Sequence, residues 1–267
     1  MINQRPAAVA GMFYPANAAQ LRHDIDDYLG QTQIVNTTPP KAIIVPHAGY
    51  IYSGPIAASA YVNLRPLHQQ IKKVVLLGPA HRVAFQGLAA PSADYFVTPL
   101  GDVKIDQTAL QQILTLPQVN TLDEAHELEH SLEVQLPFLQ VLLDDFELIP
   151  LVVGDASRQE VAEVLQMLWG GEETLIVISS DLSHYKSYDS ARKIDLATSA
   201  AIEQLQPEKI QYDMACGSTR SMACWKLPDK KNYTSPLSII VTPVTPPAIK
   251  IASSAMALMH LVIINHE

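Results

Sequence analysis

The chain contains little cysteine: only Cys216 and Cys224 among 267 residues. Two cysteines cannot form the disulfide framework of a small secreted domain, and a chain of this length can bury an adequate core without one. A reducing, cytoplasmic location is therefore the simpler expectation. Residues 1–11 lack a basic segment followed by a long apolar run, so we also expect no signal peptide.

Long apolar runs and clusters of basic residues are also absent. The most apolar late stretch, residues 251–264, is shorter than the roughly 20 residues that a membrane helix needs, and serines and a histidine interrupt it. The formal net charge is −9, with no block of lysine or arginine. We therefore expect neither nucleic acid nor a membrane surface as a partner.

The chain does contain a regular alternation of strand-like and helix-like segments. Short apolar runs predict buried strands at 42–45, 73–77, 88–90, 103–105, 146–153 and 175–179. Apolar periodicity and caps predict helices at 18–30, 56–64, 108–114, 131–143 (kinked at Pro137), 157–169 and 190–205. This alternation predicts a single-domain α/β fold, with a mostly parallel or mixed sheet and helices on both faces.

Three of the predicted strands run directly into turns that carry histidine. His47 follows the strand 42–45, and His81 follows the strand 73–77. Asp181 and His184 follow the strand 175–179. Because ligands collect at the carboxyl ends of strands in an open α/β sheet, we expect these four side chains to converge on one edge.

Such a cluster has the chemistry of a metal site, although a single histidine after a strand is more often an ordinary loop residue. Imidazole suits zinc, copper and iron, and two histidines with one anionic ligand are typical of non-heme iron oxygenases. Asp181 could supply that carboxylate or could orient His184. A histidine that binds no metal could act as a general acid or base near neutral pH.

Several strings along the chain, taken together, resemble the Memo family, whose bacterial and archaeal members are called AmmeMemoRadiSam system protein B. The matching strings include V-P-H-A-G-Y-I-Y-S-G-P, L-G-P-A-H, E-H-S-L-E-V-Q-L-P-F-L and S-S-D-L-S-H-Y, at residues 45–55, 77–81, 129–139 and 179–185. Shorter matches lie at residues 9–15, 98–101 and 216–217. The family is similar in fold to the class III extradiol ring-cleaving dioxygenases.

The resemblance implies a metal pocket formed by His47, His81 and Cys216. In it His184 would act as acid or base, and Asp181 would orient His184. It implies iron(II) as the first choice of metal, with copper or zinc as alternatives, and redox chemistry. Ring cleavage does not follow, because a thiolate replaces the carboxylate ligand of the dioxygenases. The family's genes tend to accompany a radical SAM protein gene, which implies a shared pathway.

Other polar and aromatic residues beside the matched strings are candidates for a substrate pocket. Tyr50 and Tyr52 could form a wall for an aromatic group, and Arg82 could face an anionic group of a small-molecule ligand. His130 could bind a substrate oxygen, and Tyr185 adjoins His184. Each of these residues could equally be an ordinary packing or surface residue, and the same pocket could serve a binding module without turnover.

The segment His126-Glu127-Leu128-Glu129-His130 fits the H-E-x-x-H pattern of zinc proteases. A zinc hydrolase that uses His126 and His130 is therefore a further alternative. A polar, loop-like stretch precedes this segment, which favours instead a role for Glu129 and His130 at the start of the helix 131–143.

Residues 218–267 differ in character from the Memo-like domain at 1–217. Proline, lysine and serine are scattered over 218–250, followed by the apolar stretch at 251–264. In a shifted reading frame, the codons of residues 222–226 permit the string Gly-Leu-Leu-Glu, which resembles the family's C-terminal section. A frameshift just after Gly217 is our hypothesis for this atypical segment, and a divergent but native C-terminus is the alternative.

Overall fold

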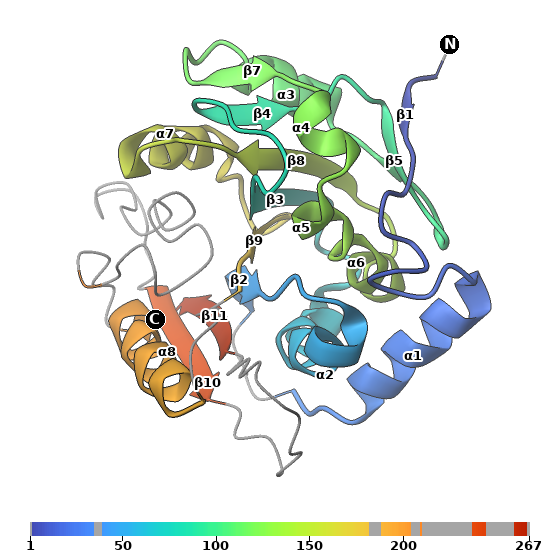
Figure 1. Ribbon diagram of the computed structural model, residues 1–267, viewed down its shortest axis with the longest axis vertical. Coiled ribbons are helices and arrows are strands. Elements are labelled where there is room, and N and C mark those ends of the chain that lie inside the picture. The colour runs from blue at the N-terminus through green and yellow to red at the C-terminus, as the bar shows by residue number, and fades with distance from the viewer. Residues whose placement is uncertain are drawn as a thin grey trace.

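The computed structural model describes residues 2–34, 39–181, 188–203, 209, 237–243 and 259–265 (Figure 1). The described helices are α1 (Ala18–Gly30), α2 (Tyr50–Tyr61), α3 (Gln107–Ile113), α4 (Glu124–Glu127), α5 (His130–Glu133), α6 (Leu136–Leu142), α7 (Arg158–Leu168) and α8 (Tyr188–Glu203). A 3-10 helix, η1, spans Val62–Leu67. No described helix combines the length and the apolar character needed to cross a membrane.

The main sheet has eight described strands in the order β10-β11-β2-β9-β3-β8-β4-β7. Their bounds are β2 (Pro40–Val45), β3 (Lys73–Pro79), β4 (Leu88–Ala90), β7 (Val119–Thr121), β8 (Glu147–Val153), β9 (Thr174–Ser179), β10 (Leu237–Pro243) and β11 (Met259–Asn265). The central strands β2, β9, β3 and β8 are parallel, whereas β4 is antiparallel to β8 and β11 to β2. The sheet is therefore mixed, as predicted.

Helices cover both faces of this sheet, as Figure 1 shows. On one side α2 packs against β2 and β11, and α5 packs against β3 and β8. On the other side lie α7 and α8, of which α8 contacts β10 and β11. All six residues of β9 are buried, which is expected for a parallel strand covered on both faces. The alternating apolar runs thus form the core.

A second, smaller sheet packs beside the main one. It contains β1 (Gln4–Arg5), β5 (Tyr95–Thr98) and β6 (Gly101–Lys104), in that order. The strand β1 has only two residues, so it is too short to be predicted from the periodicity of apolar residues in the sequence. It positions the buried side chain of Arg5 beside α5, so the smaller sheet ties the N-terminal segment to the region that carries His130.

Two predicted helix boundaries were wrong, and both errors involve proline. We predicted a helix start near Pro55, but α2 begins at Tyr50 and Pro55 lies inside it. A proline this near the start removes only one early helical hydrogen bond. The predicted helix 131–143 is divided into α5 and α6, and Pro137 lies in the first turn of α6. There its missing N–H leaves no partner unsatisfied.

Gly78, near the end of β3, allows α5 to approach the sheet closely. A Cβ atom at this position would lie 2.7 Å from Ser131 Oγ and 2.8 Å from Leu132 Cδ2. Ser131 Oγ also donates a hydrogen bond to the Pro79 carbonyl, at 3.0 Å. The lack of a side chain at Gly78 therefore brings His130, at the start of α5, close to the loop after β3.

Candidate metal centre

The ends of the central strands bring His47 and His81 together. Because β9 lies between β2 and β3, the turns that follow these strands leave the sheet at the same edge. The ring centroids of His47 and His81 are 5.1 Å apart. The Asp181 carboxylate accepts a 2.8 Å hydrogen bond from the His47 backbone N–H. The convergence predicted for these three residues is confirmed.

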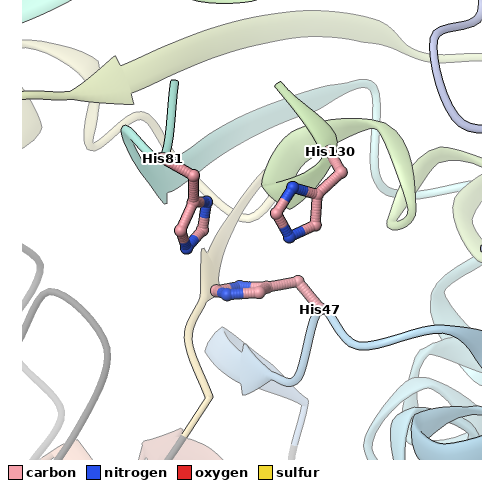
Figure 2. Close-up of side chains that lie close together, drawn as sticks. All are labelled: His47, His81 and His130. Carbon is pink, nitrogen blue, oxygen red and sulfur yellow. The ribbon is translucent and has the colours of Figure 1, made fainter. Parts of the chain in front are cut away.

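A third histidine joins them from α5. The ring centroid of His130 lies 5.5 Å from that of His47 and 4.6 Å from that of His81. One nitrogen from each of the three rings lies within 4.8 Å of the corresponding nitrogens of the other two. Figure 2 shows the rings facing a common space from three separate segments. From its sequence context, His130 was expected to bind a substrate oxygen, to lie at the start of a helix or to bind zinc together with His126, but not to join His47 and His81.

The hydrogen bonds of His47 determine which ring nitrogen is free. Its Nδ1 lies 3.0 Å from Ser179 Oγ, and the single hydroxyl proton of Ser179 is donated to the Ser131 carbonyl at 2.6 Å. Ser179 Oγ must therefore accept a hydrogen bond from His47 Nδ1–H. In the neutral ring this leaves the lone pair on Nε2, which is the nitrogen that a metal would require.

A carboxylate has the same effect on His81. His81 Nδ1 lies 2.8 Å from Glu129 Oε1, and the backbone N–H of His81 donates to Glu129 Oε2 at 2.6 Å. Burial alone would raise the pKa of the Glu129 carboxyl, but hydrogen bonds from His81 and from the Ser131 and His81 backbone lower this pKa to about 2. The ionised carboxylate can only accept, so Nδ1 of His81 carries the proton, and in the neutral ring the lone pair lies on Nε2.

His130 is neutral at physiological pH. Burial, followed by the neighbouring His47 ring, lowers the pKa of His130 to about 4. Its ring also packs on Phe13, with centroids 4.7 Å apart. A group of three imidazoles, two of which keep the proton on Nδ1 and the lone pair on Nε2, fits the donor set that zinc, copper or iron prefers. The described residues therefore suit the transition metal that the sequence implied.

The remaining predicted site residues lie in several different environments. Asp181 lies against His47, with its Oδ2 3.7 Å from His47 Nε2. Tyr50 is buried in the core, and its hydroxyl donates to the Val134 carbonyl at 2.7 Å, whereas Tyr52 is exposed. Arg82 is exposed in the loop after His81. Cys216, His184 and Tyr185 lie outside the described residues.

The H-E-x-x-H segment does not form one helix. The chain leaves α4 at Leu128, and α5 begins at His130. His126 is buried, with Nε2 3.0 Å from the Ala89 carbonyl, and burial lowers its pKa to about 4. Because the two histidines belong to different helices, the geometry gives no support to the zinc-hydrolase alternative. Glu129 is the N-cap of α5, as expected.

Two supporting residues were not identified as such from the sequence. Ser179 is a polar residue at the end of an apolar strand. The switch from apolar to polar side chains at this position was the sequence feature that could have indicated its role. Gln135 donates from Nε2 to the Pro46 carbonyl at 2.8 Å and to Ser179 Oγ at 2.9 Å. No local pattern distinguishes Gln135 from a surface glutamine, because its partners are remote in sequence.

Comparisons with known proteins identify the family of the chain. Residues 5–226 match the family described as Memo-like protein. A MEMO1 family protein from Aquifex aeolicus (strain VF5) is 41% identical over 213 residues, covering 78% of each chain. A MEMO1 family protein from Ignicoccus hospitalis is 37% identical over 237 residues, covering 80% of this chain and 82% of the relative.

A third MEMO1 family protein, from Methanococcoides burtonii, is 34% identical over 225 residues and covers 80% of this chain and 83% of the relative. The Memo family has the extradiol dioxygenase-like fold, so the predicted fold class is confirmed. On the family match and on these identities, the chain belongs to the Memo family.

Proposed function

We propose that this protein binds a transition-metal ion at His47, His81 and His130 and uses it in redox chemistry on a small molecule. The observation that carries the proposal is the meeting of three ring nitrogens within 4.8 Å of one another. Cys216 is our expected additional or alternative ligand. Iron(II) is the first choice of metal, with copper or zinc as alternatives.

The protein's own residues would perform distinct tasks. His47, His81 and His130 would hold the ion, and the bound metal would supply Lewis-acid and redox chemistry. Ser179 and Glu129 hold the Nδ1 protons of His47 and His81. His184 remains our proposed acid or base, oriented by Asp181. A cytoplasmic location and a pathway shared with a radical SAM protein belong to the same proposal.

A cavity of about 540 Å³ gives a small molecule room beside the centre. The loop 80–86 lines it together with Gly154 and Asp155. The side chains of His47, His130 and His81 are 2%, 15% and 26% exposed, so the cluster is most open at His81, the histidine that borders this cavity. We propose that substrate approaches from this side.

Arg82 is the permanent cation among the described residues that line this cavity. We propose that it binds a carboxylate or phosphate group of the substrate, since a guanidinium forms paired hydrogen bonds with such groups. Small carboxylates and phosphates can be screened by their effect on the melting temperature. A hit that stabilises the wild-type protein but not Arg82→Ala supports this assignment, whereas equal stabilisation of both contradicts it.

Metal analysis of protein purified without oxygen tests the function. We expect bound iron in the wild-type protein and its loss in His47→Ala, His81→Ala and His130→Ala, with His68→Ala as an exposed control histidine. Cys216→Ser tests the thiolate. Folded wild-type protein that binds none of the three metals would refute the proposal and favour a binding module. Oxygen uptake with catechol-type substrates then tests for dioxygenase chemistry.

A further inference from the structure

Glu129 is a buried carboxylate that lies against two of the three histidines. Its side chain is 1% exposed. Glu129 Oε1 lies 2.8 Å from Nδ1 of His81 and 3.4 Å from Nδ1 of His130. The two rings that share this oxygen are stacked, with an angle of 29° between their planes. One carboxylate oxygen thus lies beside the Nδ1 edges of two candidate ligands.

The other contacts of Glu129 hold this carboxylate in place. The backbone N–H of His81 donates to Oε2 at 2.6 Å, and the backbone N–H of Ser131 donates to Oε1 at 2.9 Å. Both backbone groups can only donate. An amide in place of the carboxylate would therefore direct its NH2 group at an N–H donor in either orientation. The site is selective for an ionised carboxylate.

The Nδ1 atom of His130 is buried and has no hydrogen bond among the described atoms. A buried nitrogen without a partner is costly, and Glu129 Oε1 is an acceptor within reach of a small adjustment. Histidines that bind metals commonly donate their second ring N–H to a carboxylate, which fixes the ring and raises its basicity. Here one carboxylate is placed to serve two rings.

We propose, on the basis of the metal site above, that Glu129 is a positioning residue shared by His81 and His130. It holds the Nδ1 proton of each ring, so that both Nε2 atoms are directed at the same ion. It does not itself bind the ion. This role goes beyond helix capping, in which Glu129 would matter only for the stability of α5.

Glu129→Gln and Glu129→Asp test this role, with Glu133→Gln as the matched control. Glu133 is a buried carboxylate at the end of α5, but its hydrogen bonds are with Arg5, Tyr14 and the backbone of residues 8 and 9. We expect Glu129→Gln to weaken Co²⁺ binding about 10- to 100-fold, with an altered visible spectrum of the bound Co²⁺. Folded Glu133→Gln should bind Co²⁺ as the wild-type protein does.

Imidazole ¹⁵N NMR of the metal-free protein provides a second measurement that does not depend on metal binding. The wild-type His81 should show the Nδ1–H form, and Glu129→Gln should show a mixture of tautomers. Glu129→Asp retains the charge and should retain most of this preference, which keeps the test available if Glu129→Gln fails to fold.

Unchanged tautomers, together with Co²⁺ affinity within about twofold of wild type in the folded Glu129 variants, would overturn the proposal. If wild-type protein shows the Nδ1–H tautomer of His81 but binds no metal, the proposed function fails, and the role of Glu129 toward a metal fails with it. If wild-type protein binds metal and Glu129→Gln binds it equally well, the role of Glu129 alone is refuted.

Discussion

His47 Nδ1 donates to the hydroxyl of Ser179, whose own proton is donated to the Ser131 carbonyl. This relationship gives the first prediction. Ser179→Ala removes the acceptor that holds the Nδ1 proton, so the two tautomers of His47 become closer in energy. We expect metal affinity to fall about tenfold, measured by titration with Co²⁺. Ser59→Ala, a hydroxyl bonded within α2, is the control, and an equal loss there would contradict the prediction.

The second prediction concerns the buried ion pair between Arg5 and Glu133. Arg5 also donates to the carbonyls of His126 and Glu129, at 2.8–2.9 Å. Arg5→Ala leaves the Glu133 carboxylate buried without its cation, and we expect the free energy of unfolding to fall by about 3–5 kcal/mol. Chemical denaturation measures this change.

Lys104 provides the comparison for Arg5, because its ion pair with Glu147 is on the surface, where the Lys104 side chain is 60% exposed. Lys104→Ala should cost far less stability than Arg5→Ala, because solvent screens an exposed ion pair. Similar losses in the free energy of unfolding for Arg5→Ala and Lys104→Ala would show that burial of the Arg5–Glu133 ion pair does not determine its contribution to stability.

Gly78 gives the third prediction. A methyl group at this position would contact Ser131 and Leu132 of α5 at 2.7–2.8 Å. We expect Gly78→Ala to destabilise the protein by about 1–3 kcal/mol, and to weaken metal binding because α5 carries His130. Gly30→Ala is the matched control, since nothing lies within 4 Å of a Cβ there. Equal stability of the two variants would refute the close approach.

The fourth prediction is a loss of stability in mild acid. Burial lowers the pKa of His126 from 6.5 to about 4. Above pH 6.5 the ring is neutral in both folded and unfolded chains, so no free energy is lost there. As the pH falls from 6.5 to 4, the unfolded chain binds a proton that the folded chain does not. Stability should therefore fall, with a contribution from His126 approaching about 3 kcal/mol by pH 4.

Denaturation at pH 7, 6, 5 and 4 measures this loss. His130 has a similarly lowered pKa, so His126→Gln should remove only part of the pH dependence. The same slope in wild type and His126→Gln would contradict the assignment.

The fifth prediction concerns the atypical segment after Gly217. If a frameshift lies there, resequencing the gene across the codons of residues 216–218 should reveal an inserted or deleted base. A single unbroken frame to the stop codon would end this hypothesis. The family match extends to residue 226.

The order of helices and strands could be predicted largely from the sequence, because each strand's apolar run and each helix's cap act locally. Asn17 illustrates this: its side chain caps α1, the helix predicted at 18–30, by accepting from Gln20 N–H. The strand ends likewise predicted that His47 and His81 would meet. The helix boundaries predicted near Pro55 and Pro137 were wrong, because a proline in the sequence marks the start of a helix only to within several residues.

The membership of the histidine group could not be predicted in full. His130 enters it only because Gly78 lets α5 approach β3, and no pattern near His130 reveals a contact with Gly78. Glu129 and Ser179 were visible as polar residues, but their partners, His81 and His47, lie 48 and 132 residues away in the chain. Contacts of this kind depend on the tertiary fold.

The position of β9 between β2 and β3 has a consequence for synthesis of the protein. During translation, the strands that carry His47 and His81 emerge long before the strand that must be inserted between them. Until the ribosome has released β9, a nascent chain cannot bring these two imidazoles to their final separation. If the proposed metal site is correct, metal acquired earlier would bind to an immature geometry, so metal binding should follow completion of the central sheet.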